Sequence, residues 1–157
     1  MKKQVLWFGM VILALAALPL AGGVGGSQAR PFKAKSVAYV TADYGPTYDV
    51  VMCGQATHLG NFKGQFPGIQ YFPEGPDGPA NVGDGTLTAA NGDSVTIHMV
   101  DYPFYMDESI AVAHGTYDIK RGTGRFLHAS GHGSYIGVID LTNLNPPEFT
   151  FEGTIVY

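Results

Sequence analysis

The sequence predicts an all-β protein whose single domain is an eight-stranded antiparallel up-and-down barrel. β-branched and aromatic residues recur in short runs separated by Gly, Pro, Asn and Asp, which is typical of strands joined by turns. After residue 29, no stretch places apolar residues at i, i+3, i+4 and i+7 over the length of a helix. Eight strands of about nine residues suit a closed barrel, because closure removes the edges that recruit other chains. An open sandwich is the alternative architecture.

The composition describes a weakly charged, turn-rich chain of one-domain size. The 157 residues include 22 glycines and 10 prolines, and only 14% of them are charged. One domain typically takes roughly 100–200 residues, so there is no room for a separate cofactor domain. The net charge of −4 excludes broad electrostatic capture of nucleic acid, and no nucleic-acid partner is expected.

Residues 1–29 predict a secretory signal peptide. Two lysines precede an apolar run from Val5 to Leu20, which is shorter than the roughly 20 residues that span a bilayer, and small residues follow it. Small residues also lie at the −3 and −1 positions of a cleavage site after Ala29, and cleavage near Ala21 is the alternative. We therefore expect a barrel domain over 30–157 that is exported, periplasmic or extracellular, with no stable membrane insertion after the leader is removed. An uncleaved membrane anchor is the other interpretation.

Cys53 is the only cysteine, so no disulfide forms within the chain. It follows the apolar run Val50 to Met52, and a free cysteine in such a setting usually behaves as a small buried hydrophobe. We expect a buried, inert thiol in preference to a nucleophile.

The expected strands are short apolar or aromatic runs bounded by turn residues. They are Ser36 to Asp43, Val50 to Leu59, part of Phe62 to Phe72, Thr86 to Ala90, Ser94 to Val100, Ser109 to Ile119, Phe126 to Leu141 and Phe149 to Tyr157. The last is the clearest, because its aromatic and aliphatic residues alternate with polar ones and fall on one face of a strand. Residues 73–85 hold three prolines and four glycines and are expected to form a long loop at the rim.

Two turns are expected from local chemistry. Asn91-Gly92 separates two apolar runs, and this dipeptide favours a type I′ hairpin turn with two positive φ angles. Gly122 and Gly124 are expected to accept positive φ in a second hairpin turn, after which Phe126 starts the next strand pointing inward. A phosphate-binding loop is the alternative for these glycines, but no helix follows them to face a pyrophosphate.

The histidines and serines do not form a catalytic or metal-binding motif. His128 and His132 have a spacing that brings two ligands together on a helix, whereas on a strand roughly 13 Å separates them. No metal and no cofactor are therefore expected. Ser-His-Asp catalysis lacks support because the sequence has no G-x-S-x-G elbow.

Carboxylates remain candidates for acid–base chemistry. Asp101, Asp107 and Glu108 flank an aromatic loop expected at Tyr102 to Met106, and a carboxyl packed against aromatic rings has a raised pKa. Solvated loop acids are the alternative. The aromatic residues either line an apolar cavity or form the core, and the ligand-binding candidates for a barrel lumen are Tyr39, His98, Tyr117 and Phe151.

The stretch from Gly92 to Tyr157 resembles the allene oxide cyclase and dirigent group of β-barrels. In that group a glycine turn leads into G-[TS]-G-x-F-x-x-[AV]-x-G, which the residues from Gly122 to Gly131 match, and Phe149 to Gly153 match its aromatic closing strand. Small exported bacterial proteins of unassigned role share similar phrases at Ala56 to Gly60 and Ala89 to Asp93.

The resemblance implies an eight-stranded barrel with an apolar lumen. Plant cyclases of the group rearrange an unsaturated fatty-acid epoxide, and dirigent proteins orient phenoxy radicals for coupling. The cyclases carry E-x-N-E in their first strand, and Tyr39 to Asp43 offers neither the glutamate nor the asparagine, so no cyclase residue is carried over. Asp43 and Asp101 are the conceivable positions for dirigent-type aspartates.

The function expected from these patterns is non-enzymatic binding of a small apolar or aromatic ligand in the lumen of an exported barrel. Two alternatives stay open at this point. One is a cyclase-like or dirigent-like protein that steers a reactive intermediate, and the other is a structural envelope protein.

Overall fold

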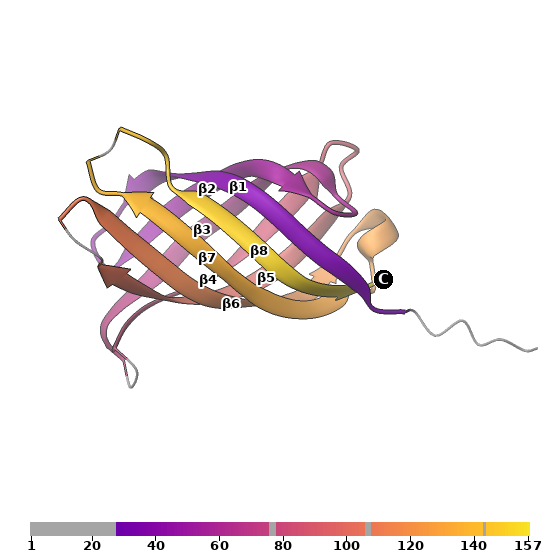
Figure 1. Cartoon of the computed structure of the whole chain (residues 1–157). Helices are drawn as coiled ribbons and strands as arrows, with labels where there is room; N and C mark the ends of the chain where they lie inside the picture. Colours follow the sequence, from indigo (N-terminus) through magenta and orange to yellow (C-terminus); the bar gives the residue numbers. More distant parts are fainter. Residues whose placement is uncertain (1–27, 76–77, 106–107, 143) are drawn as a thin grey trace, which may run out of the picture.

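The computed structural model describes residues 28–75, 78–105, 108–142 and 144–157. Over these residues eight antiparallel strands form a closed barrel in which each strand pairs with the next and β8 returns to β1 (Figure 1). The expected all-β barrel is therefore confirmed, whereas the leader over 1–29 falls almost entirely outside the described residues and stays a prediction. The strands are β1 (Arg30–Asp43), β2 (Thr47–Ala56), β3 (Gly60–Gly75), β4 (Gly78–Ala89), β5 (Ser94–Tyr105), β6 (Ile110–Gly122), β7 (Ser130–Asp140) and β8 (Glu148–Val156).

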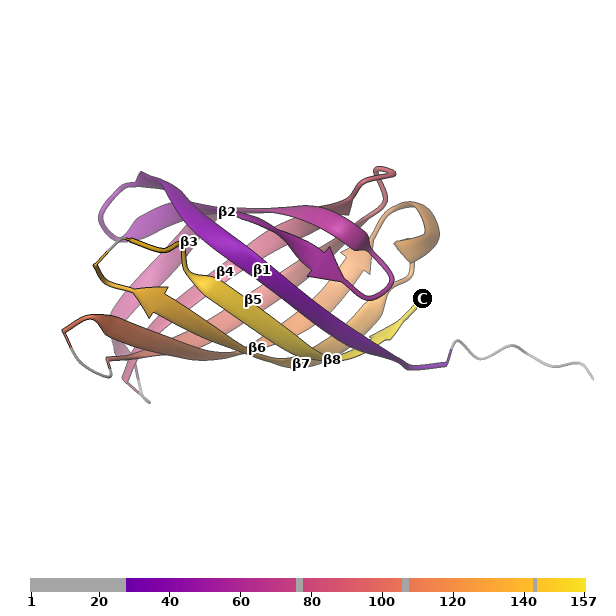
Figure 2. The ribbon, with the colours of Figure 1, turned by 45° about the horizontal axis from the view of Figure 1, so that its top comes forward.

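The barrel has two different ends. The turns after β2, β4 and β6 gather at the end where β1 begins and β8 finishes, and we call this the closed end (Figures 1 and 2). The opposite end, where β1 finishes, is called the open end. In the part of the chain that the structure describes, no helix has the length and apolar character needed to cross a membrane.

The prediction of a long loop at 73–85 is wrong. β3 continues to Gly75 and β4 starts at Gly78, so Pro73 and Pro79 lie within strands, and residues 76–77 lie outside the described residues. The β3–β4 pairing is irregular between Gln65 and Gln70 and again between Phe72 and Gly75. Pro67 and Pro73 fall in these irregular stretches, where a missing backbone N–H disturbs the ladder least. The aromatic segment expected as a loop after Asp101 likewise belongs to β5, because it pairs with β6 through Tyr105.

The expected hairpin at Asn91-Gly92 is confirmed, but the predicted type I′ turn is wrong. The Gly92 N–H donates to the Ala89 carbonyl at 3.0 Å, and the Ala89 N–H donates to the Asp93 carbonyl at 2.8 Å. Gly92 has φ +91, whereas Asn91 does not have a positive φ. This is a three-residue loop whose last residue is left-handed and forms a bulge, so one positive φ is enough.

The segment after β6 is a short 3-10 helix, Gly124–Phe126, and β7 begins only at Ser130. The expectation that Phe126 starts a strand is therefore wrong, although its side chain does point inward and is fully buried. Gly124 has the expected positive φ, +57. Gly122 does not have a positive φ. Glycine is needed there because a Cβ would lie 2.3 Å from the Ser94 carbonyl oxygen.

Large side chains fill the lumen at the closed end. The ring of Phe126 lies 4.8 Å from the ring of Tyr157, and Tyr117 packs between Phe32 and Phe151 at 5.9 and 5.7 Å. Within the described residues the Tyr117 hydroxyl is buried without a hydrogen-bond partner, and burial raises its pKa to about 12. The buried side chains of the closed end thus form a packed core.

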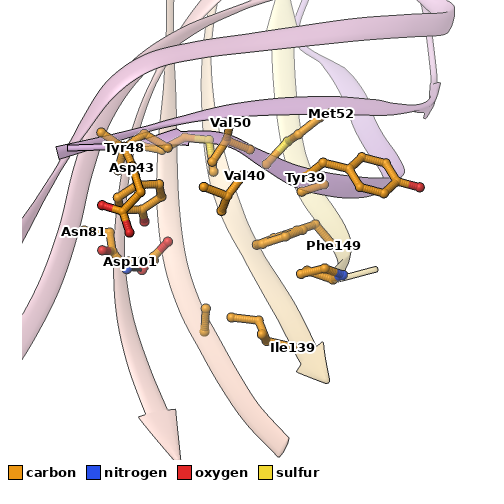
Figure 3. Close-up of a pocket in the computed structure, with 15 residues that line it drawn as sticks. Tyr39, Val40, Asp43, Tyr48, Val50, Met52, Asn81, Asp101, Ile139 and Phe149 are labelled. Carbon is orange, nitrogen blue, oxygen red and sulfur yellow. Dashed lines mark hydrogen bonds between the residues drawn. The ribbon is translucent and has the colours of Figure 1, made fainter. Parts of the chain in front are cut away.

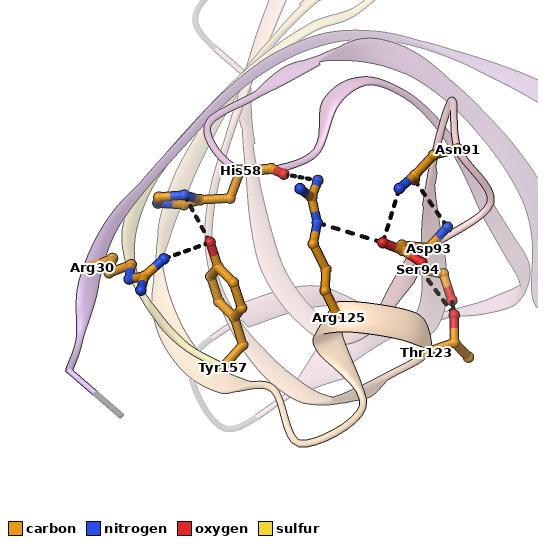
Figure 4. A network of polar contacts seen from close by, with 8 residues as sticks. All are labelled: Arg30, His58, Asn91, Asp93, Ser94, Thr123, Arg125 and Tyr157. Carbon is orange, nitrogen blue, oxygen red and sulfur yellow. Dashed lines mark hydrogen bonds and ion pairs between the residues drawn. The ribbon is translucent and has the colours of Figure 1, made fainter. Parts of the chain in front are cut away.

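Polar contacts tie the closed end together from five separate segments (Figure 4). Arg125 donates to the backbone carbonyl of His58 and forms an ion pair with Asp93 at 3.5 Å. The Tyr157 hydroxyl accepts from Arg30 at 2.9 Å and lies 3.2 Å from His58 Nδ1. These contacts hold the turns after β2, β4 and β6 close to the start of β1 and the end of β8.

The expectation that Cys53 is buried is wrong. β2 alternates, with Val50 and Met52 buried in the lumen and Cys53 exposed on the outer surface. The apolar run in the sequence does not distinguish the two faces, because each face carries apolar residues here.

Candidate functional site

A cavity of about 330 Å³ opens at the open end of the barrel (Figure 3). Its wall is mostly apolar, with a small group of polar side chains. The lining residues are Ala38, Tyr39, Val40, Asp43, Tyr48, Val50, Met52, Ile69, Asn81, Met99, Asp101, Ala113, Ile139, Pro147 and Phe149.

The cavity has space because the lumen-facing side chains of β1 and β6 become smaller toward the open end. Along β1 the inward residues pass from Phe32 to Ala38, and along β6 they pass from Tyr117 to Ala113. A barrel of eight strands has an interior that side chains just fill or that holds one small ligand. Alanine at these positions therefore leaves space that the closed end does not have.

Asp101 is the central polar group of the cavity. Its Oδ1 accepts a hydrogen bond of 2.7 Å from Asn81 Nδ2, and its Oδ2 accepts one of 2.9 Å from the Tyr135 hydroxyl. Asn81 meets it because the two residues are paired in the β4–β5 register. Burial raises the pKa of Asp101, and the two hydrogen bonds counteract part of that effect because they stabilise the ionised form.

Two tyrosines surround this carboxyl. Burial and the charge of Asp101 raise the pKa of Tyr135 and of Tyr48 far above the ordinary value for a phenol, so both remain protonated donors. The Tyr135 ring lies over Gly115, where a Cβ would come within 2.3 Å of its Cζ. A glycine on β6 is therefore what lets this ring reach Asp101.

Asp43 and Tyr39 lie at the mouth of the cavity. The Asp43 carboxylate accepts a hydrogen bond from the Gly45 N–H at 2.8 Å, and Tyr39 is 51% exposed. The structure thus brings Asp43 and Asp101, the two conceivable dirigent-type positions, to one cavity. Among the described residues that line the cavity, none is Lys, Arg or His.

The four lumen candidates have three different positions. Tyr39 lines the cavity mouth, whereas Tyr117 and Phe151 point into the lumen but belong to the packed closed end. The expected lumen position of His98 is corrected, since it lies on the outer face of β5, where its Nδ1 contacts Asp84 at 2.8 Å. Its neighbours in the chain, Ile97 and Met99, take the inward positions.

The residues that sequence reasoning missed are Asn81, Tyr48 and Tyr135. Asn81 lies in the segment that the sequence predicts to be a loop, so its position in a strand was not expected. Tyr135 is 34 residues from Asp101 in the chain, and only the pairing of the strands brings its hydroxyl to the Asp101 carboxyl. The raised pKa expected for an acid beside aromatic rings is confirmed for Asp101. Glu108 is exposed to solvent, and Asp107 lies outside the described residues.

The histidines offer no site for a metal in the part of the chain that the structure covers. His128 lies in the turn before β7 and His132 on β7, and both are exposed. Over the described ranges no group of three or more His, Cys, Asp or Glu side chains is arranged to hold a metal ion.

Comparison with known proteins supports the fold. The pterocarpan synthase dirigent protein GePTS1 has a similar solved structure, with a TM-score of 0.51 over 90% of this chain and 96% of that chain. The two sequences are 13% identical, so the likeness concerns the fold, and the expected dirigent-like barrel is confirmed at that level. No protein-family model matches the chain, and no curated protein matches it by sequence.

Proposed function

We propose that this protein binds a small apolar or aromatic molecule in the cavity at the open end of its barrel, with Asp101 as the polar contact. The observation that carries the proposal is a partly buried carboxyl, held by two hydrogen bonds, that faces a mostly apolar cavity. Burying a carboxyl is costly, and an apolar residue of similar size usually stabilises a fold at least as well. A perturbed acid in a mostly apolar cavity is typical of a binding site.

The size of the cavity suits a small molecule. Its volume of about 330 Å³ lies near the lower end of the roughly 300–1,000 Å³ found for ligand sites. The aromatic side chains at the wall, Tyr39, Tyr48 and Phe149, favour a flat apolar ligand.

A saturation experiment tests this function. The neutral fluorescent probe N-phenyl-1-naphthylamine is titrated into the purified protein, and we expect saturable uptake at about one molecule per chain. Ala113→Leu fills the cavity from β6 and is expected to abolish most of the uptake. Thr116→Leu adds an apolar side chain on the outer face of the same strand and is the matched control, with uptake unchanged. Absence of saturable uptake by the parent protein would refute the proposal.

Dirigent-like steering of a reactive intermediate is the second candidate function. It is favoured by the carboxyl itself, since a lumen with only aliphatic and phenyl groups offers no polar contact for orienting an intermediate. The test generates phenoxy radicals from a phenol with an external oxidant and measures the enantiomeric ratio of the coupled product. Steering is supported if the protein changes the enantiomeric ratio from that without protein and if Asp101→Asn loses this effect. An unchanged racemic product excludes it for the phenol used.

We also propose that the protein is exported. The first strand begins at Arg30, directly after the predicted cleavage site at Ala29. Cell fractionation combined with intact mass measurement tests this. The expected result is a periplasmic or extracellular chain starting at Arg30, and a full-length chain in the membrane fraction would contradict it.

A further inference from the structure

As far as the structure describes the cavity wall, it has two acids and no base. Asp101 lies in its interior and Asp43 at its mouth, and none of the described lining residues is Lys, Arg or His. A carboxylate entering this space would lose its hydration, gain no cationic partner and face two like charges. The wall therefore disfavours anionic ligands.

Asp101 has neutral partners only. Asn81 and Tyr135 each donate one hydrogen bond to it, and none of the ion pairs among the described residues includes it. Buried carboxylates in proteins are usually paired with a positive charge. An ionised carboxylate accepts up to about four hydrogen bonds, so capacity remains for a donor inside the cavity.

The aromatic residues of the wall suit a cation as well. Tyr48 and Phe149 line the cavity together with Asp101, and the faces of aromatic rings attract ammonium groups within about 6 Å. Carboxylate and ring faces together provide the contacts that a protonated amine on an apolar body requires.

We propose that the ligand of this cavity is an apolar or aromatic molecule carrying a protonated amine, which pairs with Asp101, and that the cavity rejects carboxylates. This inference rests on the proposed binding function. The raised pKa of Asp101 agrees with it, because a buried negative charge that lacks a counter-charge resists ionisation until a cation binds.

Three naphthalene probes of nearly equal shape test the inference by calorimetry near pH 7 in low salt. They are 2-naphthylmethylamine as the cation, 2-naphthalenemethanol as the neutral molecule and 2-naphthoate as the anion. The alcohol reports whether the cavity binds a naphthalene at all. We expect the amine to bind about tenfold more tightly than the alcohol, and the naphthoate about tenfold or more weakly than the alcohol.

Asp101→Asn is the decisive variant. It should bring the affinities of the amine and the alcohol to within about threefold of each other, since the charge contact is lost while the shape is kept. Asp118→Asn makes the same change in net charge on the outer face, where Asp118 pairs with Lys120 at 3.0 Å, and should leave all three affinities unchanged. If Asp101→Asn does not fold, Asp43→Asn at the exposed mouth replaces it, with a smaller loss of amine preference.

The possible outcomes separate the two proposals. Naphthoate binding as tightly as the amine would overturn this inference and leave the proposed binding function intact. An amine preference that survives Asp101→Asn, or Asp43→Asn where Asp101→Asn does not fold, would overturn it in the same way. If none of the three probes binds, the proposed function fails and the inference fails with it.

Discussion

Two tyrosine hydroxyls in the lumen differ in whether they have a hydrogen-bond partner, and we expect their removal to change the stability of the fold differently. The Tyr135 hydroxyl donates to Asp101 at 2.9 Å, whereas the Tyr117 hydroxyl is buried without a hydrogen-bond partner among the described residues. Tyr135→Phe therefore removes a hydrogen bond to a charged group, which is worth about 1.5–3 kcal/mol. Tyr117→Phe removes an unsatisfied group and is expected to be neutral or to stabilise by up to about 1 kcal/mol.

The free energy of unfolding from urea denaturation near pH 7 measures both effects. Both substitutions delete one oxygen from a ring that is 2% exposed, so the apolar burial is matched. We expect Tyr135→Phe to be the less stable variant by at least about 1.5 kcal/mol. The cost of Tyr135→Phe should shrink in acid, because a protonated Asp101 is a weaker acceptor than the ionised form. If Tyr117→Phe destabilises as much as Tyr135→Phe, the assignment of the Asp101 network is wrong.

Three further predictions concern stability and reactivity. Gly124→Val forces a β-branched residue to φ +57 and displaces the Asp93 carboxylate, whose Oδ1 would lie 1.8 Å from the new Cβ. We expect the free energy of unfolding to fall by about 1–3 kcal/mol, which a thermal melt measures. An unchanged midpoint would refute the turn geometry. Asp101 has a folded pKa above its ordinary value of 3.8, so its contribution is most favourable when it is protonated and declines as the pH rises through the folded pKa. Asp101→Asn should therefore gain stability relative to the parent protein as the pH is raised from about 4 to 7, and a constant difference across that range would contradict the raised pKa. Cys53 is exposed and should react with a thiol reagent in the folded protein nearly as fast as in urea, whereas strong protection in the folded state would place it in the core.

Local chemistry was enough to predict the all-β class, the position of one hairpin and one left-handed glycine. Alternation in the closing strand, the hairpin at Asn91-Gly92 and the left-handed Gly124 each depend on residues near one another in the chain. The segment 73–85 was misassigned for the same reason, since proline and glycine indicate a turn locally. Pairing with neighbouring strands extends β3 and β4 through that segment, and no local signal contains this information.

The site depended on tertiary structure. A period of two shows which residues share a face of a strand but does not say which face points inward. The prediction therefore placed His98 and Cys53 inside, whereas both lie on the outer surface. Asp101 acquires its hydrogen bonds from Asn81 on β4 and Tyr135 on β7, and these meet only because the barrel closes with one particular register. The sequence by itself thus determined the all-β class and most of the strands, because alternation and turn residues are local, and it favoured a closed barrel over an open sandwich. The tertiary structure decided where the lumen is empty and which acid faces it, because those depend on side-chain sizes summed across all eight strands.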